Sequence, residues 1–454
     1  MKSVALHNLG CKVNGYEMDV MQQMLQEKGF KIVPFDEWAD IYIVNTCTVT
    51  NIADRKSRQM LHKARKLNPD AVVVAAGCYV QTGKEDVIKD AGVDLAIGNN
   101  KKKELVAILE KYLEERYEKT NEKTNANTSE QAWNAKTLDD TTIIDIGNTR
   151  EFESMRLRET SGNTRAYIKI QDGCNQFCSY CIIPYARGRV RSRNEKDVLE
   201  EIRGLAVKGY KEVVLTGIHI SSYGVDFGGP ALLSLIKAIH EVEGIERIRL
   251  GSLEPGIITE EFASELKRLP KFCPHFHLSL QSGCDETLKR MNRKYTSGEY
   301  YEKVELLRNI FDNPAITTDV IVGFPGETQE EFAVTEKYLE KIKLYEMHIF
   351  KYSKRKGTRA AQMDHQVSDD KKTERSNILL SMEKEYSREY RARYIGKEVE
   401  VLFEEEKMIE GKRYQTGHTK QYVKVAKPAD GSLSNQLVKG KAVGFLQEDL
   451  LLME

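Results

Sequence analysis

Two runs of alternating apolar segments and amphipathic helices constrain the fold of this 454-residue chain. Parallel strands need long crossover connections, usually helical, so this alternation predicts parallel sheets covered by helices. The strands expected in the first run, which ends near residue 115, are Val4–Asn8, Ile41–Asn45, Ala71–Ala76 and Asp94–Ile97. The strands expected in the second run are Ala166–Ile170, Glu212–Thr216, Arg247–Leu250, His275–Leu280, Ala315–Val322 and Glu346–Phe350. Six consecutive β/α units predict a partial barrel, with reactive groups on the loops that follow the strands.

Helical periodicity fills the intervals between these strands. The expected helices are Gly15–Lys28, Ala53–Leu67, Glu195–Val207, Leu232–Val242, Glu260–Leu269, Glu299–Ile310, Thr328–Ile342 and Ser368–Tyr394. Thr328 and Glu331 have the spacing of a capping box. In the long helix Ser368–Tyr394, the apolar stripe is expected to be Met382, Tyr386 and Tyr390.

The chain changes character in two further places. Glu118–Asp140 is rich in Asn, Thr, Lys and Glu, a composition that favours a linker over a packed segment. Gly396–Glu454 carries short alternating strands broken by glycine, which predicts a small antiparallel barrel. We therefore expect an α/β protein with an α/β domain (1–115), a linker (116–160), a TIM-like (β/α)6 barrel (161–393) and a small β-barrel (394–454).

Charge and apolar runs exclude several classes of protein. Lys plus Arg (69) equals Asp plus Glu (69), so a nucleic-acid partner must be met by local basic patches. The N-terminal sequence has no signal-peptide pattern, and no apolar run approaches the ~18 residues of a membrane span. We expect a cytoplasmic protein without membrane contact. In a reducing compartment, its eight cysteines indicate metal binding or catalysis rather than disulfides.

Three of these cysteines follow the first expected barrel strand with the spacing Cys174–x3–Cys178–x2–Cys181. Three thiolates on one loop suit a 4Fe–4S cluster that keeps one iron open, because complete ligation by protein needs four. A structural zinc site also needs four ligands, and the usual spacing supplies no fourth Cys or His. Zinc therefore remains the weaker alternative.

Three more cysteines, Cys11, Cys47 and Cys78, each lie just beyond an expected strand of the first run. The carboxyl ends of parallel strands share one edge of a sheet, so these thiols can converge although they are far apart in sequence. A buried, inert cysteine is the alternative at each position taken alone. Cys273 and Cys284 fit neither set, and we expect them to be structural.

The segments Gly173–Cys181 and Ile183–Gly188, together with Gly10–Asn14, Asn45–Thr48 and Ala76–Tyr79, resemble the methylthiotransferase family of radical S-adenosylmethionine (SAM) enzymes. The resemblance implies two 4Fe–4S clusters, one on Cys174, Cys178 and Cys181, and an auxiliary one on Cys11, Cys47 and Cys78. The first would cleave SAM to a 5′-deoxyadenosyl radical that takes hydrogen from adenine, and the second would supply the sulfur. All six cysteines would then be catalytic.

The resemblance also implies ligand contacts along the barrel. The residues expected to border SAM are Tyr180, Gly217, Ser279, Gln281 and Gly323. Arg187, Arg189, Arg191 and Arg193 alternate in sequence, so in an extended segment they would present four guanidinium groups to phosphates on one face. The alternative is a solvated charge run paired with Glu195 and Asp197. Gly396–Val399 and Gly417–Val425 resemble the TRAM RNA-binding domain, and the residues expected to contact RNA there are Lys412, Arg413, Tyr422 and Lys424.

The implied activity is methylthiolation of adenosine 37 in the anticodon stem-loop of tRNA. Lys12–Val13 and Arg189–Arg193 are similar to the subgroup that acts on N6-threonylcarbamoyladenosine, whereas the isopentenyladenosine subgroup usually has Gln–Met at the first pair. The implied partners are tRNA and an electron donor such as flavodoxin or ferredoxin, and we expect a monomer. A non-catalytic, redox-sensing iron–sulfur RNA-binding protein and a zinc-stabilised RNA-binding scaffold remain alternatives.

Overall fold

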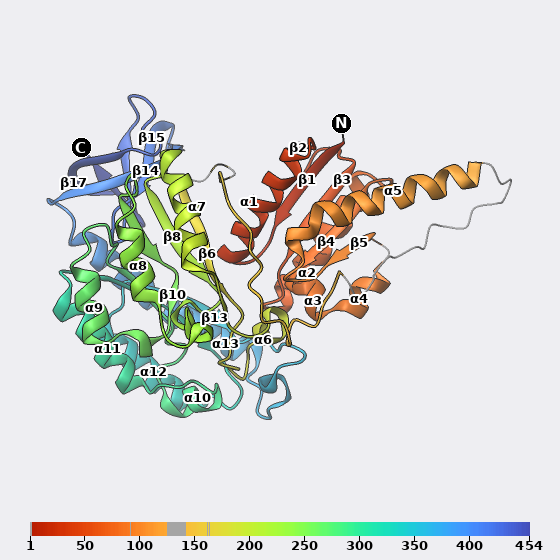
Figure 1. Ribbon diagram of the computed structural model, residues 1–454. Helices are drawn as coiled ribbons and strands as arrows, with labels where there is room; N and C mark the ends of the chain where they lie inside the picture. The colour runs from red at the N-terminus through yellow and green to blue at the C-terminus, as the bar shows by residue number, and fades with distance from the viewer. Residues whose placement is uncertain (1, 91, 125–141, 161, 163) are drawn as a thin grey trace. The chain divides into compact units, whose positions relative to one another are not determined.

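The computed structural model describes residues 2–90, 92–124, 142–160, 162 and 164–454 (Figure 1). Most of the expected linker Glu118–Asp140 lies outside these residues. Contacts divide the chain into two units. Unit 1 comprises Met1–Glu159, Asp172–Asn175 and Cys181–Arg193, and unit 2 comprises Thr160–Gln171, Gln176–Tyr180 and Asn194–Glu454.

Unit 1 is built on a parallel sheet of five strands in the order β2-β1-β3-β4-β5. The strands are β1 (Ser3–Asn8), β2 (Lys31–Val33), β3 (Ile41–Thr46), β4 (Val72–Gly77) and β5 (Leu95–Ile97). The helices are α1 (Lys12–Glu27), α2 (Asn51–Leu67), α3 (Cys78–Thr82), α4 (Lys84–Lys89), η1 (Lys102–Glu104), α5 (Leu105–Thr124) and, from the later segment, α6 (Ile183–Arg187), with the short strand β7 (Arg191–Ser192). The strand order reverses between β1 and β3, and ligands of such sheets bind at the carboxyl ends beside that reversal.

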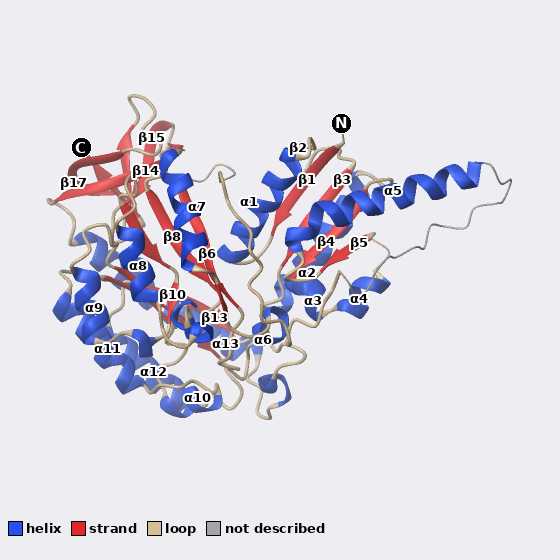
Figure 2. Ribbon diagram, viewed as in Figure 1, coloured by secondary structure: helices blue, strands red, loops and turns tan. Residues whose placement is uncertain are grey.

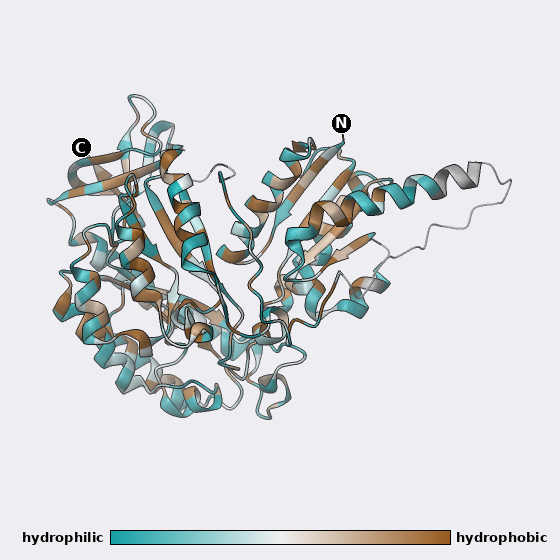
Figure 3. Cartoon of the chain, in the orientation of Figure 1, coloured by the Kyte–Doolittle hydropathy of each residue, from teal (hydrophilic) through white to brown (hydrophobic). Residues whose placement is uncertain are grey.

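Helices cover both faces of this sheet. Tyr42 and Val44 of β3 share a buried cluster with Leu61 and Ala64 of α2. Strand alternation turns Ile41 and Ile43 to the other face, where they are also fully buried. The α1 crossover runs from β1 to β2 and the α2 crossover runs the opposite way from β3 to β4, so the right-handed rule places α1 and α2 on opposite faces. Figure 3 shows the hydrophobic colouring of the strands that results from burial on both sides.

Part of the expected linker belongs to the folded domain. The helix α5 continues to Thr124, past the predicted boundary at residue 115. Farther on, Ile143, Ile146 and Met155 are buried, and the carbonyl of Met155 accepts a hydrogen bond from the Tyr16 hydroxyl at 2.6 Å. The polar composition that suggested a linker does not extend to these apolar residues, so residues 142–159 pack on the α/β domain.

Unit 2 begins with the predicted series of β/α units (Figure 2). Its strands are β6 (Arg165–Asp172), β8 (Glu212–Gly217), β9 (Arg247–Leu250), β10 (Ser252–Leu253), β11 (His275–Leu278), β12 (Ala315–Val322) and β13 (Glu346–Lys351). Its helices are α7 (Glu195–Val207), α8 (Leu232–His240), α9 (Glu260–Lys267), α10 (Asp285–Arg290), α11 (Ser297–Ile310), α12 (Gln329–Ile342) and α13 (Asp369–Ala392), with short turns η2 (Ile220–Ser222), η3 (Val225–Phe227), η4 (Pro255–Ile257) and η5 (Arg359–Gln362). The pairs β6–β8–β9 and β10–β11–β12–β13 are parallel, and β10 follows β9 directly, which gives the expected partial barrel.

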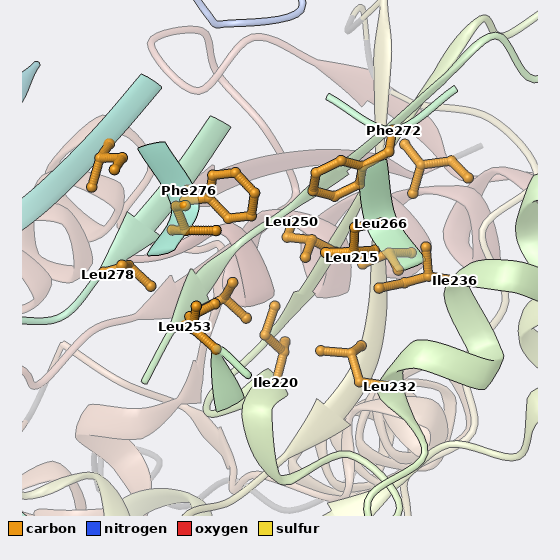
Figure 4. Close-up of a cluster of buried hydrophobic side chains, with 14 of the residues drawn as sticks. Leu215, Ile220, Leu232, Ile236, Leu250, Leu253, Leu266, Phe272, Phe276 and Leu278 are labelled. Atoms are coloured by element: carbon orange, nitrogen blue, oxygen red, sulfur yellow. The ribbon is translucent and has the colours of Figure 1, made fainter. Parts of the chain in front are cut away.

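The two faces of the barrel strands differ in polarity. Alternate residues such as Leu215 and Leu250 enter one large apolar cluster with Ile236 of α8 and Leu266 of α9, as Figure 4 shows. The intervening residues turn to the inside of the barrel and are largely polar; they include Arg165, Lys169, Glu212, Arg247, Arg249, His275, His277 and Asp319. The interior therefore offers charged and hydrogen-bonding groups instead of the usual aliphatic layers.

The predicted capping box at Thr328 and Glu331 is present at the start of α12. Tyr386 of α13 is buried in the barrel cluster and Met382 packs against it, whereas Tyr390 belongs to the core of the C-terminal barrel. That barrel closes in the order β14-β15-β16-β18-β17. Its strands are β14 (Glu398–Ile409), β15 (Lys412–His418), β16 (Lys424–Pro428), β17 (Leu437–Gln447) and β18 (Leu450–Met453).

Two interior arginines of unit 2 attach the C-terminal barrel to the β/α barrel. The Arg247 guanidinium donates to the carbonyls of His418 (2.8 Å) and Glu400 (2.9 Å). Arg249 donates to the carbonyls of Lys420 (2.8 Å) and Thr419 (3.3 Å), while the Glu212 carboxylate accepts from its Nε at 2.7 Å. Because all these groups are buried or half-buried, the two barrels form one continuous structure.

Candidate metal centres and active site

The three early cysteines lie at the carboxyl edge of the unit 1 sheet, as the sequence predicted. Cys11 precedes α1, Cys47 follows β3, and Cys78 begins α3 directly after β4. Gly10 has a φ of +107°, and a side chain there would come within 3.0 Å of the Cys47 Cβ. Gly77 has a φ of +98°, and a Cβ there would lie 2.7 Å from the Asn45 Oδ1 and 2.9 Å from the Thr46 carbonyl oxygen. The two glycines let the strand ends approach each other, which brings the thiols to one place.

The thiols are close enough to affect one another's ionisation. Burial, with smaller contributions from nearby Cys78 and Cys11, raises the pKa of Cys47 to about 11. Burial also raises the pKa of Cys11, so the Cys11 and Cys47 thiols resist ionisation unless a cation stabilises their thiolates. This arrangement fits a metal centre better than three independent structural cysteines.

The spacing of the thiols distinguishes a cluster from a single ion. One group of three described residues has its ligand atoms within 4.8 Å of one another: His277, Asp319 and His348. The cysteine trio does not form such a group among the described residues. The sulfurs of a tetrahedral zinc site lie within about 4 Å of one another, since each is about 2.3 Å from the ion. In a 4Fe–4S cluster each thiolate binds a different iron, so the sulfurs stand wider apart. A three-cysteine 4Fe–4S cluster is compatible with this wider spacing, and the role of Cys11, Cys47 and Cys78 as its ligands stays a prediction.

Arg187 is buried beside this trio. Its Nε donates to the Cys78 Sγ at 3.2 Å, and its terminal nitrogens bind both carboxylate oxygens of Glu17, at 2.5 and 3.0 Å. Asn14, Glu17 and Asn99 also surround the cysteines, and sequence reasoning did not single out any of the three. The i, i+3 spacing of Asn14 and Glu17 on α1, just after Cys11, is the one signal that could have indicated them.

The prediction of four guanidinium groups on one exposed face is wrong for three of them. Arg187, Arg191 and Arg193 are at most 1% exposed. Arg191 lies 3.7 Å from the Asp172 carboxylate, and Arg193 donates to the Tyr16 hydroxyl at 3.2 Å. The alternation rule failed because Ile183–Arg187 is a helix. In addition, Glu17 and Asp172 pair with Arg187, and Asp172 also lies near Arg191, inside the protein. Arg189 is exposed as predicted.

The loop that carries Cys174, Cys178 and Cys181 follows β6, the first barrel strand. The Cys174 amide donates to the Gly188 carbonyl at 3.0 Å within unit 1. Within unit 2, the Cys178 Sγ accepts a hydrogen bond from Arg293 at 3.1 Å, and Arg293 also binds the Glu254 carboxylate at 2.5 Å. Arg293 follows α10 in a polar segment without periodic pattern, so the sequence gave no reason to select it.

A cavity of about 510 Å³ opens beside this region of unit 2. Its polar lining includes Gln176, His219 and Glu254, and its apolar lining includes Leu232, Ile257 and Phe262. The His219 Nε2 has no hydrogen-bond partner among the described residues, and burial lowers the pKa of this imidazole. A neutral imidazole and a carboxylate on one wall can recognise a polar ligand with an amino or hydroxyl group.

The five residues predicted to border SAM lie in unit 2 at or near the carboxyl ends of strands, but other residues line this cavity. Tyr180 packs edge-on against Phe324, with ring centroids 6.3 Å apart. Gln281 and Gly323 both have a φ of +70°, and the Ser279 carbonyl accepts from the Tyr295 hydroxyl at 2.5 Å. A side chain at Gly217 would come within 2.9 Å of the Gln171 carbonyl, so this position requires glycine. Their contact with SAM stays a prediction.

The residues predicted to contact RNA divide into two groups. Lys412 and Arg413 are exposed at the start of β15, and Lys424 is half-buried. Tyr422 is instead packed between the imidazoles of His418 and His275, at centroid distances of 4.4 and 5.0 Å, with Arg165 and Arg249 also against its ring. A ring enclosed in this way is a link between the two barrels, so base stacking on Tyr422 conflicts with its position.

A partial parallel barrel whose first strand leads into a Cys-x3-Cys-x2-Cys loop defines a radical SAM enzyme. The "Radical SAM superfamily" profile matches residues 168–339, and the profile described as "Uncharacterized protein family UPF0004" matches residues 3–98. The chain is 38% identical to "Threonylcarbamoyladenosine tRNA methylthiotransferase MtaB" of Bacillus subtilis, over 97% of this chain and 94% of that protein. It is 35% identical to "tRNA-2-methylthio-N(6)-dimethylallyladenosine synthase" of Acetivibrio thermocellus, over 96% and 88%.

The chain belongs to the radical SAM tRNA methylthiotransferase family. Among solved structures, the radical SAM methyltransferase TsrM of Kitasatospora setae, with cobalamin and a [4Fe-4S] cluster bound, superposes with a TM-score of 0.54 at 17% identity, over 77% of this chain and 72% of that one. This likeness concerns the fold. The family's cofactors are 4Fe–4S clusters and SAM, in agreement with the two cysteine triplets. No helix in the described part of the chain is long and apolar enough to cross a membrane.

Proposed function

We propose that this protein converts N6-threonylcarbamoyladenosine at position 37 of tRNA into its 2-methylthio derivative. The observation that carries the proposal is the convergence of Cys11, Cys47 and Cys78 at one sheet edge, in a chain that also holds the radical SAM triplet. The relatives named for threonylcarbamoyladenosine, at 35–38% identity over at least 90% of this chain, favour that substrate. The relatives named for the dimethylallyl nucleoside, at 32–36% identity, make it the second candidate.

In this proposal, the protein itself binds and orients the reactants. When bound, the clusters and SAM supply the electron, the radical and the sulfur. The six cysteines ligate the two clusters, and Arg293 and Arg187 each donate a hydrogen bond to one thiolate. SAM binds at the strand ends that carry Gly217, Gln281 and Gly323, and the cavity beside His219 and Glu254 is a second candidate position for it. The apolar part of that cavity excludes water from the reaction.

We also propose a division of labour along the chain. The α/β domain, which includes α5 and residues 142–159, holds the auxiliary cluster. Residues 161–393 form the radical SAM core, and 394–454 bind tRNA in the manner of a TRAM domain. The enzyme would act as a cytoplasmic monomer with flavodoxin or ferredoxin as electron donor. Its eight thiols, none of them in a disulfide, support a reducing compartment.

The substrate is tested by analysing tRNA nucleosides from a strain that lacks the gene. Loss of the 2-methylthio-threonylcarbamoyl nucleoside, with accumulation of its unthiolated precursor, is the expected result by mass spectrometry. Re-expression of the intact gene must restore it. Loss of the methylthio-dimethylallyl nucleoside instead would assign the second substrate, and no change in either would reject the proposed function.

The RNA surface is tested with the double variant Lys412→Ala/Arg413→Ala. Each phosphate contact contributes roughly 0.7–0.9 to the slope of log affinity against log salt, so losing both should reduce the slope by about 1.5. Lys439→Ala, on β17 of the same barrel, controls for a general loss of charge. Titration of the tRNA at several salt concentrations measures the slope, and an unchanged slope would remove these two residues from the interface. Truncation at residue 396 is a poorer test, since it also exposes Arg247 and Arg249.

A further inference from the structure

Arg187 has all five of its N–H groups in contact with acceptors inside unit 1. Nε donates a hydrogen bond to the Cys78 Sγ, and the two terminal nitrogens donate to the side chains of Glu17, Asn14 and Asp172. The side chain is 1% exposed. A guanidinium group has a rigid donor fork, so acceptors on all its sides fix both its position and its orientation.

The charges around Arg187 favour a negative sulfur. Lys102 binds the Glu17 carboxylate, and Arg191 lies near Asp172, so three buried cations accompany two buried carboxylates in these ion pairs. A thiolate at Cys78 adds a third negative charge at the sulfur to which the Arg187 Nε donates. Buried charges are stable when they are paired and hydrogen-bonded, and this group meets both conditions once the thiolate is counted.

The Cys78 sulfur accepts hydrogen bonds from side-chain donors. Its Sγ accepts from the Arg187 Nε at 3.2 Å and from the Asn99 Nδ2 at 3.5 Å. Asn99 is held in place by a second bond, to the Ala186 carbonyl at 2.7 Å. The interactions that favour the Cys47 thiolate come from the backbone of Val49 and Thr48 instead. The Arg187 charge also favours the Cys11 thiolate. Its hydrogen bond, however, is made to the Cys78 sulfur.

We propose that Arg187 is a positioning residue of the auxiliary cluster, which orients the Cys78 thiolate and raises the cluster's reduction potential; this rests on the proposed function. Reduction adds negative charge to the cluster, and a cationic donor to a ligating sulfur stabilises the added charge. Arg187 also ends α6, on the same segment of unit 1 that carries Cys181. One segment thus supplies a ligand of the radical SAM cluster and the charged partner of the auxiliary cluster.

The test uses a full-length parent with Cys174, Cys178 and Cys181 replaced by alanine, so that the auxiliary cluster alone gives the signal. After anaerobic iron–sulfur reconstitution, a redox titration followed by electron paramagnetic resonance gives the reduced fraction. With Arg187→Gln, the reduced-to-oxidised ratio at a fixed potential should fall about tenfold, which is 59 mV for one electron. Arg187→Lys keeps the charge but loses the fork, and should give a smaller decrease.

Arg189→Gln, two residues away on the exposed surface, is the matched control and should leave the ratio at the parent value. If Arg187→Gln binds iron normally and titrates like the parent, the proposal is overturned. If Arg187→Gln does not bind iron, Arg187→Lys decides: a fall in the ratio supports the proposal, and the parent value rejects it. A parent that binds no cluster would instead overturn the proposed function.

Discussion

Cys174→Ala is expected to abolish formation of 5′-deoxyadenosine, whereas Cys78→Ala is expected to retain part of it while methylthiolation stops. The two cysteines belong to different triplets, and each replacement removes one of the three ligands that a site-open cluster has. Without the Cys174 cluster, SAM cannot be cleaved. Without the auxiliary cluster, the radical still forms but no sulfur is available.

The measurements are chromatography of 5′-deoxyadenosine under anaerobic reduction, mass spectrometry of the tRNA product, and iron content. Each variant should lose about four of about eight irons per chain. Cys273→Ala is the control, because this fully buried cysteine belongs to neither triplet. If Cys78→Ala cleaved SAM and also modified tRNA, the two-cluster assignment would be refuted. Zinc in place of iron in the wild-type protein would favour the zinc-stabilised scaffold.

Gly173→Ala is expected to disable the radical SAM centre, although it replaces none of the cysteine ligands. Gly173 has a φ of +72°, and an added Cβ would lie 1.8 Å from the Arg189 carbonyl oxygen and 2.8 Å from that of Gly188. Both obstacles are backbone atoms, so no side-chain rotation relieves the clash. The loop must move, and it carries the Cys174 amide bond to Gly188 with it. We expect 5′-deoxyadenosine formation to fall at least tenfold, a barrier increase of about 1.4 kcal/mol or more.

Gly29→Ala provides a matched control for backbone strain. Gly29 has a similar φ of +82°, but nothing lies within 4 Å of a Cβ built there. Its replacement should cost about 1–2 kcal/mol of stability, since alanine disfavours the left-handed region, and leave iron content and SAM cleavage unchanged. Wild-type cleavage by Gly173→Ala would show that the loop tolerates a displacement of this size.

The regular parts of the fold were predictable because their periodicities are strong. The strands Ile41–Thr46 and Val72–Gly77 are continuous apolar runs, which is the pattern of a strand buried on both faces. The three-residue strand Lys31–Val33 and the short helices after Gly77 are too brief for a periodicity to develop, and they were missed. The first domain extends beyond its predicted end near residue 115, because the helix α5 continues to Thr124 through residues of polar composition.

The cysteine positions were predictable, but their surroundings were not. A strand end can be located from local sequence, and all three early cysteines lie at one. The fate of Arg187 depends on Glu17, which is 170 residues away in the chain, and no local pattern reports such a pairing. The prediction that Tyr422 contacts RNA failed for the same reason, because its partners His275 and Arg249 lie on barrel strands far away in the sequence.

The attachment of the C-terminal barrel through main-chain carbonyls has an evolutionary consequence. Arg247 and Arg249 bind the backbone oxygens of Glu400, His418, Thr419 and Lys420. A carbonyl is present whatever the side chain is, so substitutions at these four positions preserve the hydrogen bonds as long as the backbone keeps its path. The side chains on the outer surface of this barrel can therefore change while its attachment to the β/α barrel is kept.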